Sequence, residues 1–462
     1  MVVTNIRRVR LCYLCAAVAA SLALSGCGGG DEAGSAGEGD GSGGGSAATG
    51  GTGSGGAPST PYVEPVETVD LNELPEDVPT VSLEIDEAAI ARLDQDPYTG
   101  PDEVGDFVDA DGNRYAGVDV SYRGAYALQN LIQSGGPQRN WKIKFSRELP
   151  YRTHREWNFT YQPHLREKLA YDLFRFATVK VPSARHVRLE VNGADHGLYL
   201  EYEDPDNKSW LREKVGDDSG DLYKAAYDLP GEPQYFATLE YLGDQDEDYL
   251  YHYQKKLNNN DDDATDYSLL RAFLQQLNSL PDAEVPSFLE ANFDVTKFIR
   301  YLVVSNFVSN WDGYPHRPKN FWLYEVRAAG RWLFIPWDND ATFQLETFRF
   351  NGMGVEASVF YQFDQHEPYG EHAEEGTERP LVRRMMVHDQ FRDAYVDEYR
   401  SALSRHLERD YLLERIDALE SLLSDYASDH DSAALHDASE EMREFVRTRT
   451  SVVTAELDQL AP

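Results

Sequence analysis

The chain has 462 residues, of which 41% are apolar and 12% aromatic, enough to bury the core of one large or two modest domains. Its formal net charge of −37 repels nucleic acid, so no nucleic-acid partner is expected. The same charge opposes a nucleotide, and an ATP site in this chain therefore requires local cations or bound metal ions.

The N-terminus has the pattern of a bacterial export signal. Arginines among residues 7–10 precede an apolar stretch from Leu11 to Leu24, which ends in Leu24-Ser25-Gly26-Cys27. A basic start, a short apolar run and small residues before a cleavage site indicate a secretory signal rather than a membrane span. The ending resembles a lipobox, which predicts that residues 1–26 are removed and Cys27 is acylated; an ordinary signal peptide that happens to contain Cys is the alternative.

These features predict an exported lipoprotein of the cell envelope, held at the outer membrane or cell surface by a lipid anchor at Cys27. Cys12 and Cys15 lie in the segment to be removed, so the mature chain keeps no second cysteine for a disulfide.

Residues 27–79 are expected to form a flexible tether. Gly, Ser, Ala and Thr dominate as far as about residue 61, and the segment up to Pro79 places four prolines among acidic residues. The fold is expected to begin near Thr80, where Val81–Ile85 alternates between apolar and polar residues as a strand does.

The part from about 80 to 225 is predicted to be rich in strands. Alternating patterns predict strands over residues 116–123 and 140–145, and a hairpin whose strands 187–191 and 198–202 flank the turn dipeptide Asn192-Gly193. Residues 164–177 carry apolar side chains at helical spacing.

The part from about 226 to 462 is predicted to be mostly helical. Helices are expected over 267–277, 295–309 and from 380 to the end, and two strands over 321–326 and 332–337. A strand-rich part followed by a helical part predicts an α+β domain over residues 80–462.

The residues that carry chemistry gather between Ser309 and Phe343. A predicted helix ends at Asp312, Asn320 follows eight residues later, and an apolar strand then leads into Asp338 and Asp340. Phosphoryl transfer needs an oxygen acceptor near the attacking hydroxyl and hard oxygen ligands for Mg²⁺, and Asp and Asn supply both. Taken singly, each Asp is also typical of a turn or strand end.

The motifs in this region resemble those of the spore coat protein H (CotH) kinase family. The resemblance extends over roughly residues 81–400 and rests on several segments: Tyr122-Arg123-Gly124, residues 137–145, residues 165–170, residues 191–203, Gly220-Asp221-Leu222-Tyr223-Lys224, Asn310-Trp311-Asp312-Gly313-Tyr314, residues 320–324 and residues 335–343.

The resemblance implies an atypical protein-kinase-like fold, with a strand-rich N-terminal lobe and a mostly helical C-terminal lobe. It implies that ATP and Mg²⁺ (or Mn²⁺) are used to phosphorylate Ser or Thr of secreted or surface proteins. Asp312 is then the catalytic Asp, and the metal ligands are Asn320, Asp338 and Asp340. The candidates for contacting the phosphates are Arg139, Lys142 and Lys144, one of them oriented by an ion pair with Glu167 or Glu203.

The chain departs from the family pattern at three places. Gln138-Arg139 replaces a pair of lysines, Arg317-Pro318-Lys319 separates His316 from Asn320, and Ala125-Tyr126 stands where small polar residues follow the Arg-Gly element. Arg and Lys differ in geometry, so the first change bears on nucleotide binding. The alternative function is therefore a non-catalytic surface-binding or adhesion protein on a kinase-like scaffold. A metal-dependent hydrolase is a third reading, but the sequence lacks a His-rich ligand set for it.

Overall fold

The structure is a computed structural model. It describes residues 62–72, 74, 77–161, 165–225, 235–258, 265–345, 354–361, 363 and 379–460. The predicted signal segment 1–26, Cys27 and the tether as far as residue 61 lie outside the described residues, and so do residues 259–264 of the polar run after Asn258.

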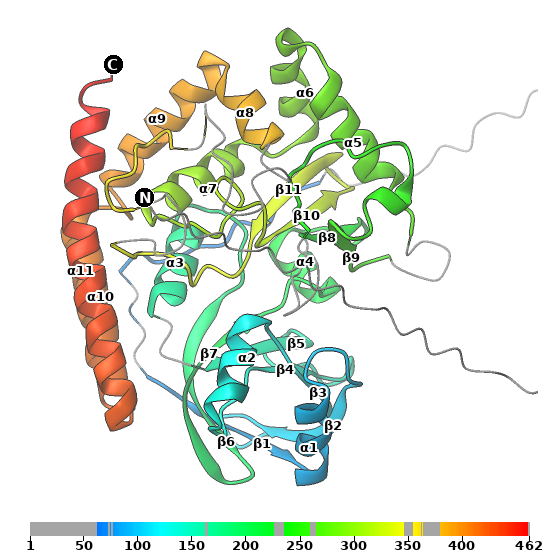
Figure 1. Ribbon diagram of the computed structural model, residues 1–462, viewed down its shortest axis with the longest axis vertical. Coiled ribbons are helices and arrows are strands. Elements are labelled where there is room, and N and C mark those ends of the chain that lie inside the picture. The colour runs from blue at the N-terminus through cyan, green and yellow to red at the C-terminus, as the bar shows by residue number, and fades with distance from the viewer. Residues whose placement is uncertain are drawn as a thin grey trace, which may run out of the picture. The chain divides into compact units, whose positions relative to one another are not determined.

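Seven described strands close into a barrel in the order β1-β2-β3-β4-β5-β7-β6 (Figure 1). β1 pairs with β6 in parallel, and the other neighbours are antiparallel. The strands are β1 Thr80–Ile85, β2 Glu103–Val108, β3 Arg114–Tyr122, β4 Trp141–Lys144, β5 Glu156–Tyr161, β6 Ala184–Val191 and β7 Ala194–Glu203.

The barrel interior is filled by the inward side chains of these alternating strands, among them Leu83, Phe107, Ile143 and Phe159, which are fully buried. β6 and β7 form the predicted hairpin. Its two turn residues, Asn192 and Gly193, have φ values of 52° and 77°, as a two-residue turn between twisted strands requires.

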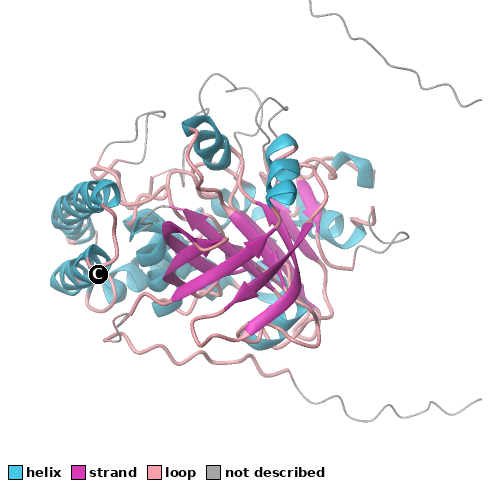
Figure 2. Ribbon diagram, turned by 90° about the horizontal axis from the view of Figure 1, so that it is seen from below, coloured by secondary structure: helices cyan, strands magenta, loops and turns pink. Residues whose placement is uncertain are grey.

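A second sheet has the order β11-β10-β8-β9. Its strands are β8 Leu222–Ala225, β9 Tyr253–Lys255, β10 Phe321–Val326 and β11 Arg331–Pro336. β10 and β11 are almost wholly apolar and buried, because this sheet lies within the core that the helices complete. Figure 2 shows the strands gathered centrally with helices around them.

The helices of the described part are α1 Glu87–Gln95, α2 Tyr126–Ser134, α3 Leu165–Phe176, α4 Lys208–Lys214, α5 Ser268–Ser279, α6 Val285–Asn292, α7 Val295–Phe307, α8 Pro380–Met386, α9 Asp389–Leu403, α10 Arg409–Ser424 and α11 Asp429–Leu457, with short 3-10 turns at Asp246–Asp248 and Asp282–Glu284. α3 is buried on nearly every side, since α7, α10, α11 and β6 all pack against it. None of these described helices combines the length and apolar character that crossing a membrane requires.

The α+β class predicted from the sequence is confirmed. The predicted segments at 81–85, 164–177, 295–309 and 332–337 correspond to β1, α3, α7 and β11. The predicted tether includes residues that the structure describes. Residues 62–72 contain no helix or strand, but they form ion pairs and hydrogen bonds with distant parts of the chain, which local composition does not reveal.

Candidate active site

The register of β10 and β11 brings the predicted acidic residues together. Phe321 lies opposite Pro336, so Asn320 and Trp337 are neighbours, and the Trp337 N–H donates to the Asn320 carbonyl at 2.9 Å. Asn320 and Asp338 both have left-handed backbone, with φ of 56° and 54°. Asn and Asp tolerate this conformation better than most residues, and such strain concentrates at functional sites.

The Asp312 carboxylate is held from two sides by its own loop. Asn320 Nδ2 donates to Asp312 Oδ2 at 2.7 Å, and Arg317 Nη1 lies 2.9 Å from Asp312 Oδ1. Burial and the charge of Asp338 raise the pKa of Asp312, and Arg317 offsets part of this rise. Since the charge of Asp338 acts on Asp312, the two carboxylates share one region of the molecule.

A buried amide pair joins the loop after α7 to the loop after β11. Asn310 Nδ2 donates to Asn339 Oδ1 at 3.0 Å, and both side chains are almost fully buried. The Thr342 hydroxyl donates to the Asn339 carbonyl, which closes the second loop on itself. These contacts fix the loops that carry Asp312, Asp338 and Asp340 relative to each other.

Helix α3 adds a fourth carboxylate to the cluster. Glu167 is fully buried, and burial together with the charges of Asp338 and Asp340 raises its pKa well above the ordinary value, an effect that Arg123 opposes. Tyr171 lies one turn further along α3, and its hydroxyl oxygen accepts the Asp338 N–H at 3.3 Å.

The carboxylate of Asp340, like that of Glu167, is repelled by neighbouring carboxylates. Asp340 is an exposed residue, although nearby protein atoms still exclude part of the water around its carboxylate. This desolvation, followed by the charges of Asp338 and Asp312, raises the pKa of Asp340 to about 8. Several carboxylates that disfavour each other's ionisation are an arrangement that a bound cation would relieve.

The donor set fits a hard divalent cation. Carboxylate and amide oxygens are the ligands that Mg²⁺ prefers, and Glu167 Oε1 has no hydrogen-bond partner among the described residues. In that same part of the chain, no three Asp, Glu, His or Cys side chains already converge closely enough to hold a metal ion. Mg²⁺ needs only one or two protein carboxylates when phosphate and water complete its shell, so this spacing is compatible with it.

A cluster of lysines from β4 and β8 lies beside two carboxylates, Glu156 of β5 and Asp204 after β7. Lys142 Nζ lies 2.8 Å from Glu156 and 2.9 Å from Asp204. Burial opposes its charge, but these two carboxylates raise the pKa of Lys142 above the ordinary value. Lys144, two residues along β4, is more exposed and lies 3.6 Å from Glu156.

Lys224 on β8 belongs to the same cluster. It lies over the rings of Trp322 and Trp337, with its Nζ 5.1 and 5.5 Å from their centroids. Burial, together with the charge of Lys256, lowers the pKa of Lys224 to about 8, and Asp204 offsets part of this. A half-desolvated ammonium of this kind gains from an anionic partner.

Arg123 links the carboxylate and lysine clusters. Its guanidinium hydrogen-bonds the Tyr202 hydroxyl and lies over the Tyr202 and Trp337 rings. Its charge acts on Glu167 and Asp340 on one side and on Lys224 on the other. The carboxylates and the lysines are therefore adjacent parts of a single site.

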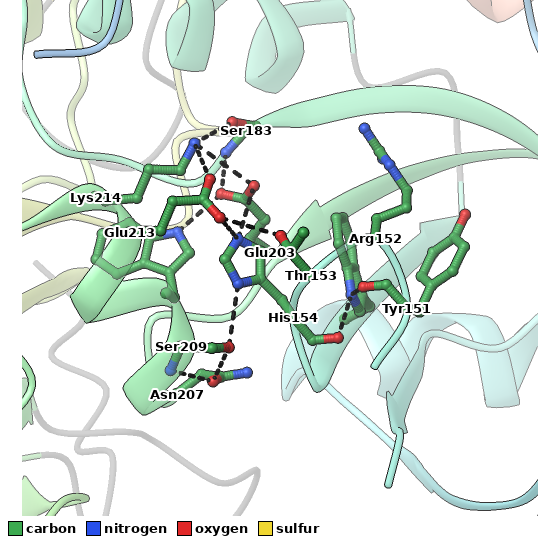
Figure 3. A network of polar contacts seen from close by, with 12 residues as sticks. Tyr151, Arg152, Thr153, His154, Ser183, Glu203, Asn207, Ser209, Glu213 and Lys214 are labelled. Atoms are coloured by element: carbon green, nitrogen blue, oxygen red, sulfur yellow. Dashed lines mark hydrogen bonds and ion pairs between the residues drawn. The ribbon is translucent and has the colours of Figure 1, made fainter. Parts of the chain in front are cut away.

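Two residues proposed from the sequence for the phosphate side are engaged elsewhere. Arg139 pairs with Asp94 at 2.9 Å and lies over the Tyr122 ring. Glu203 lies among Ser183, His154 and Lys214 (Figure 3), accepting from the Ser183 N–H at 2.9 Å. Burial opposes ionisation of Glu203, but His154 and Lys214 lower its pKa to about 2. The expected ion pair of Lys142 is made by Glu156 and Asp204 instead of Glu167 or Glu203.

Sequence reasoning did not single out Arg123, Lys224, Glu156 and Asp204 as site residues. Arg123 and Lys224 stand in segments that resemble the family motifs, and each interrupts or ends an apolar strand pattern. Asp204 directly follows β7, and Asp338 follows β11 after one intervening residue, Trp337. A charged residue at the end of a buried strand was the available signal.

Fold and site together define a mixed α+β protein with a carboxylate cluster beside a lysine- and arginine-lined region. The family model for the CotH kinase protein matches residues 120–453, which is more than half of the chain, and the chain belongs to that family.

Two further similarities were found. Inner spore coat protein H of Bacillus subtilis (strain 168) is 30% identical over 230 residues, 49% of this chain and 58% of that protein, so the match spans little more than half of the relative's length. A HipA–HipB toxin–antitoxin complex with operator DNA from Shewanella oneidensis MR-1 aligns over 85% of this chain and 77% of the other, at 11% identity and a TM-score of 0.29. A score this low carries no argument about the fold.

Proposed function

We propose that this protein is an exported atypical protein kinase that transfers the γ-phosphate of ATP to Ser or Thr of secreted or surface proteins. Membership of the CotH kinase family supports the reaction class. The observation that carries the proposal is the hydrogen-bonded framework that joins the loops of Asp312 and Asp338: Asn320 donates to Asp312, Asn310 donates to Asn339, and the Asp338 N–H donates to Tyr171.

In this proposal Asp312 accepts the proton of the attacking hydroxyl. Its carboxylate is oriented by Asn320 and Arg317, which leaves little rotational freedom to lose at the reaction step. Asp338, Asp340 and Asn320 would hold Mg²⁺ or Mn²⁺, with Glu167 close enough to contribute. Such a metal ion, when bound, neutralises phosphate charge and orients the transferred group.

Lys142, Lys224 and Arg123 would bind the phosphates. Lys142 is held by Glu156 and Asp204 much as a kinase lysine is oriented by an acidic partner. These local cations offset the repulsion that a chain with a net charge of −37 exerts on a nucleotide.

The test is phosphate incorporation from ATP with Mg²⁺ or Mn²⁺, measured for the wild type and for Asp312→Ala and Asp338→Ala. We expect incorporation by the wild type and its loss in both variants, with Arg92→Gln, which breaks an exposed ion pair with Glu103 on the barrel, as the control. Equal incorporation by all four proteins would contradict the proposal.

A second candidate is a surface-binding protein that uses the scaffold without catalysis. It is favoured by Arg139, which replaces a family lysine and faces Asp94 rather than the proposed phosphate region. Thermal stability separates the two functions, because a ligand that binds the folded state raises its melting temperature. A binding-only protein is expected to show no rise with ATP and metal.

Location at the cell surface is part of the proposal, supported by the Leu24-Ser25-Gly26-Cys27 sequence and by the name of the spore-coat relative. Cys27→Ala should abolish incorporation of labelled palmitate and shift the protein from the detergent phase to the aqueous phase. Unchanged labelling would overturn the lipid anchor and leave the kinase assignment intact.

A further inference from the structure

The segment Tyr62–Leu71, here called the strap, lies against a row of basic side chains. Glu64 is its first contact point: Lys297 Nζ lies 2.8 Å and Lys180 Nζ 3.1 Å from its carboxylate, with Arg331 at 3.9 Å. Lys180 also donates to the Pro65 carbonyl at 2.8 Å. Three cations from separate parts of the chain thus converge on one glutamate.

Glu67 makes the second set of ion pairs. Arg175 on α3 donates to its Oε1 at 2.6 and 2.9 Å, and Lys214 on α4 lies 3.8 Å away. Lys214 reaches in the other direction to Glu203 and Glu213 (Figure 3). Arg175 and Lys214 are mostly buried, so these pairs are screened less than surface pairs.

Hydrogen bonds to backbone carbonyls and close packing also hold the strap against the rest of the protein. The Tyr62 hydroxyl donates to the Val215 carbonyl, and the Leu71 carbonyl accepts from Tyr411 and Arg415 of α10. A Cβ at Gly216 would come within 2.7 Å of the Pro65 ring, so a glycine is required for this close approach.

The composition of this row is unusual for a chain with a net charge of −37. Its five cations belong to the turn after α3, to α3, α4 and α7, and to β11, yet all face the two strap glutamates. Val63 and Val66, on either side of Glu64-Pro65, are 78% and 89% exposed, whereas Tyr62, Val69 and Leu71 are partly buried against the core. Apolar packing therefore contributes to the binding of the strap, and the ion pairs of Glu64 and Glu67 supply the charge-dependent part. The cations are Arg175, Lys180, Lys214, Lys297 and Arg331.

We propose that these five cations form a recognition groove for an extended acidic peptide, and that the strap is its resident, exchangeable occupant. The groove selects two carboxylates three residues apart on an extended chain. It is a binding site separate from the carboxylate and lysine clusters described above, and its existence does not depend on kinase activity.

The test uses the full-length protein and a fluorescent peptide with the sequence of residues 62–72. In Glu64→Lys/Glu67→Lys the strap is repelled by the groove, which becomes available. We expect the peptide to bind this variant at least about tenfold more tightly than the wild type, whose groove is occupied. A peptide with Gln at both Glu positions should bind neither.

Glu84→Lys/Glu103→Lys is the matched control, because it makes the same change in net charge at two acids that pair with Arg114 and Arg92 on the barrel. It should bind the peptide as poorly as the wild type does. Equal binding to all three proteins, or binding to none, would overturn the proposal.

Proteolysis gives a second measurement that needs no charge-reversed variant. Elastase cleavage beside Val63 and Val66 should be slow in the wild type and faster in Glu64→Gln/Glu67→Gln. In the wild type it should accelerate as added salt shortens the screening length from about 10 Å to about 3 Å. A cleavage rate that is unaffected by both the substitution and the salt would show that charge does not hold the strap.

Discussion

Asn320 donates a 2.7 Å hydrogen bond to the carboxylate of Asp312, although three residues that interrupt the family motif precede it. The extra residues are accommodated within the loop: the Pro318 carbonyl accepts the Ala237 N–H, and Arg317 turns back to Asp312. The insertion therefore leaves the Asp–Asn pair intact and adds a cation to it.

This pair supplies the first prediction. Asp312→Asn keeps the shape of the side chain but removes the proton acceptor, and phosphate transfer should fall by about 10²–10⁴-fold. The melting temperature should not fall, because replacing a desolvated carboxylate whose pKa is raised relieves repulsion with Asp338. Initial rates at saturating ATP and thermal unfolding check both parts. A variant that loses activity only in proportion to lost folded protein would argue against a chemical role.

The carboxylate cluster predicts a dependence of stability on pH. The pKa of Asp340 is raised from 3.8 to about 8, so between these values the folded chain keeps a proton that the unfolded chain has lost. Stability without metal should therefore decrease as pH rises through this window. Asp340→Asn should raise the melting temperature above pH 8 and leave it unchanged below pH 4.

Added Mg²⁺ should reverse this effect of pH on the stability of the wild type. It should stabilise the wild type, increasingly as pH rises, and should stabilise Asp340→Asn much less. Asp119→Asn, at an exposed position of β3, is the control and should behave as the wild type does. If the wild type and Asp340→Asn responded to pH and Mg²⁺ identically, Asp340 would have no part in a metal site.

Local pattern was sufficient for most of the fold. Alternation along β1 and β3, the helical spacing of α3 and α7, and the Asn192-Gly193 turn are short-range signals, and each predicted element is present. Eight of the described elements were not predicted, and all of them contain nine residues or fewer, which gives too short a window for a periodic pattern: α1, β2, α2, β5, α4, β8, β9 and α6. Closure of the barrel by the parallel β1–β6 pair was also not predictable, since it joins residues about 100 positions apart.

For the candidate site, too, the proximity of some residues could be predicted from the sequence and the proximity of others could not. Asp312, Asn320 and Asp338 lie within 27 positions on adjacent elements, so their proximity follows from one strand pair. Lys142 meets its partners through the registers of three strands, and Arg123 reaches the acidic cluster from a different part of the barrel. Which Glu or Asp faces a given lysine depends on such registers and cannot be read from composition or spacing.

Lys142 supplies the third prediction. Lys142→Met removes the shared partner of Glu156 and Asp204 and leaves two largely buried carboxylates without it. Because the Lys142 side chain keeps 28% exposure, we expect a cost of roughly 2–3 kcal/mol, somewhat below that of breaking a fully buried pair. Stabilisation by ATP with Mg²⁺ should also be lost.

Lys144→Met on the same strand is the matched control. Lys144 is more exposed and its nearest carboxylate oxygen is 3.6 Å away, so its loss should cost less than about 1 kcal/mol. Chemical denaturation and ATP-dependent thermal shifts distinguish the two variants. Equal effects of the two substitutions would contradict the assignment of Lys142 to the phosphate side.

The final prediction concerns Gly220, which precedes β8 and thereby sets the position of Lys224. A Cβ at Gly220 would lie 1.7 Å from the Glu325 carbonyl oxygen of β10, so Gly220→Ala must push β8 away from its neighbour. We expect a cost of about 3 kcal/mol or more and a loss of ATP-dependent stabilisation, because Lys224 moves with the strand.

Gly112→Ala is the control: its Cβ meets no atom within 4 Å, and only its φ of 83° is unfavourable for Ala, at about 1–2 kcal/mol. It should unfold somewhat earlier but keep its response to ATP, and an equal loss of that response in both variants would show that β8 does not position a phosphate-binding lysine.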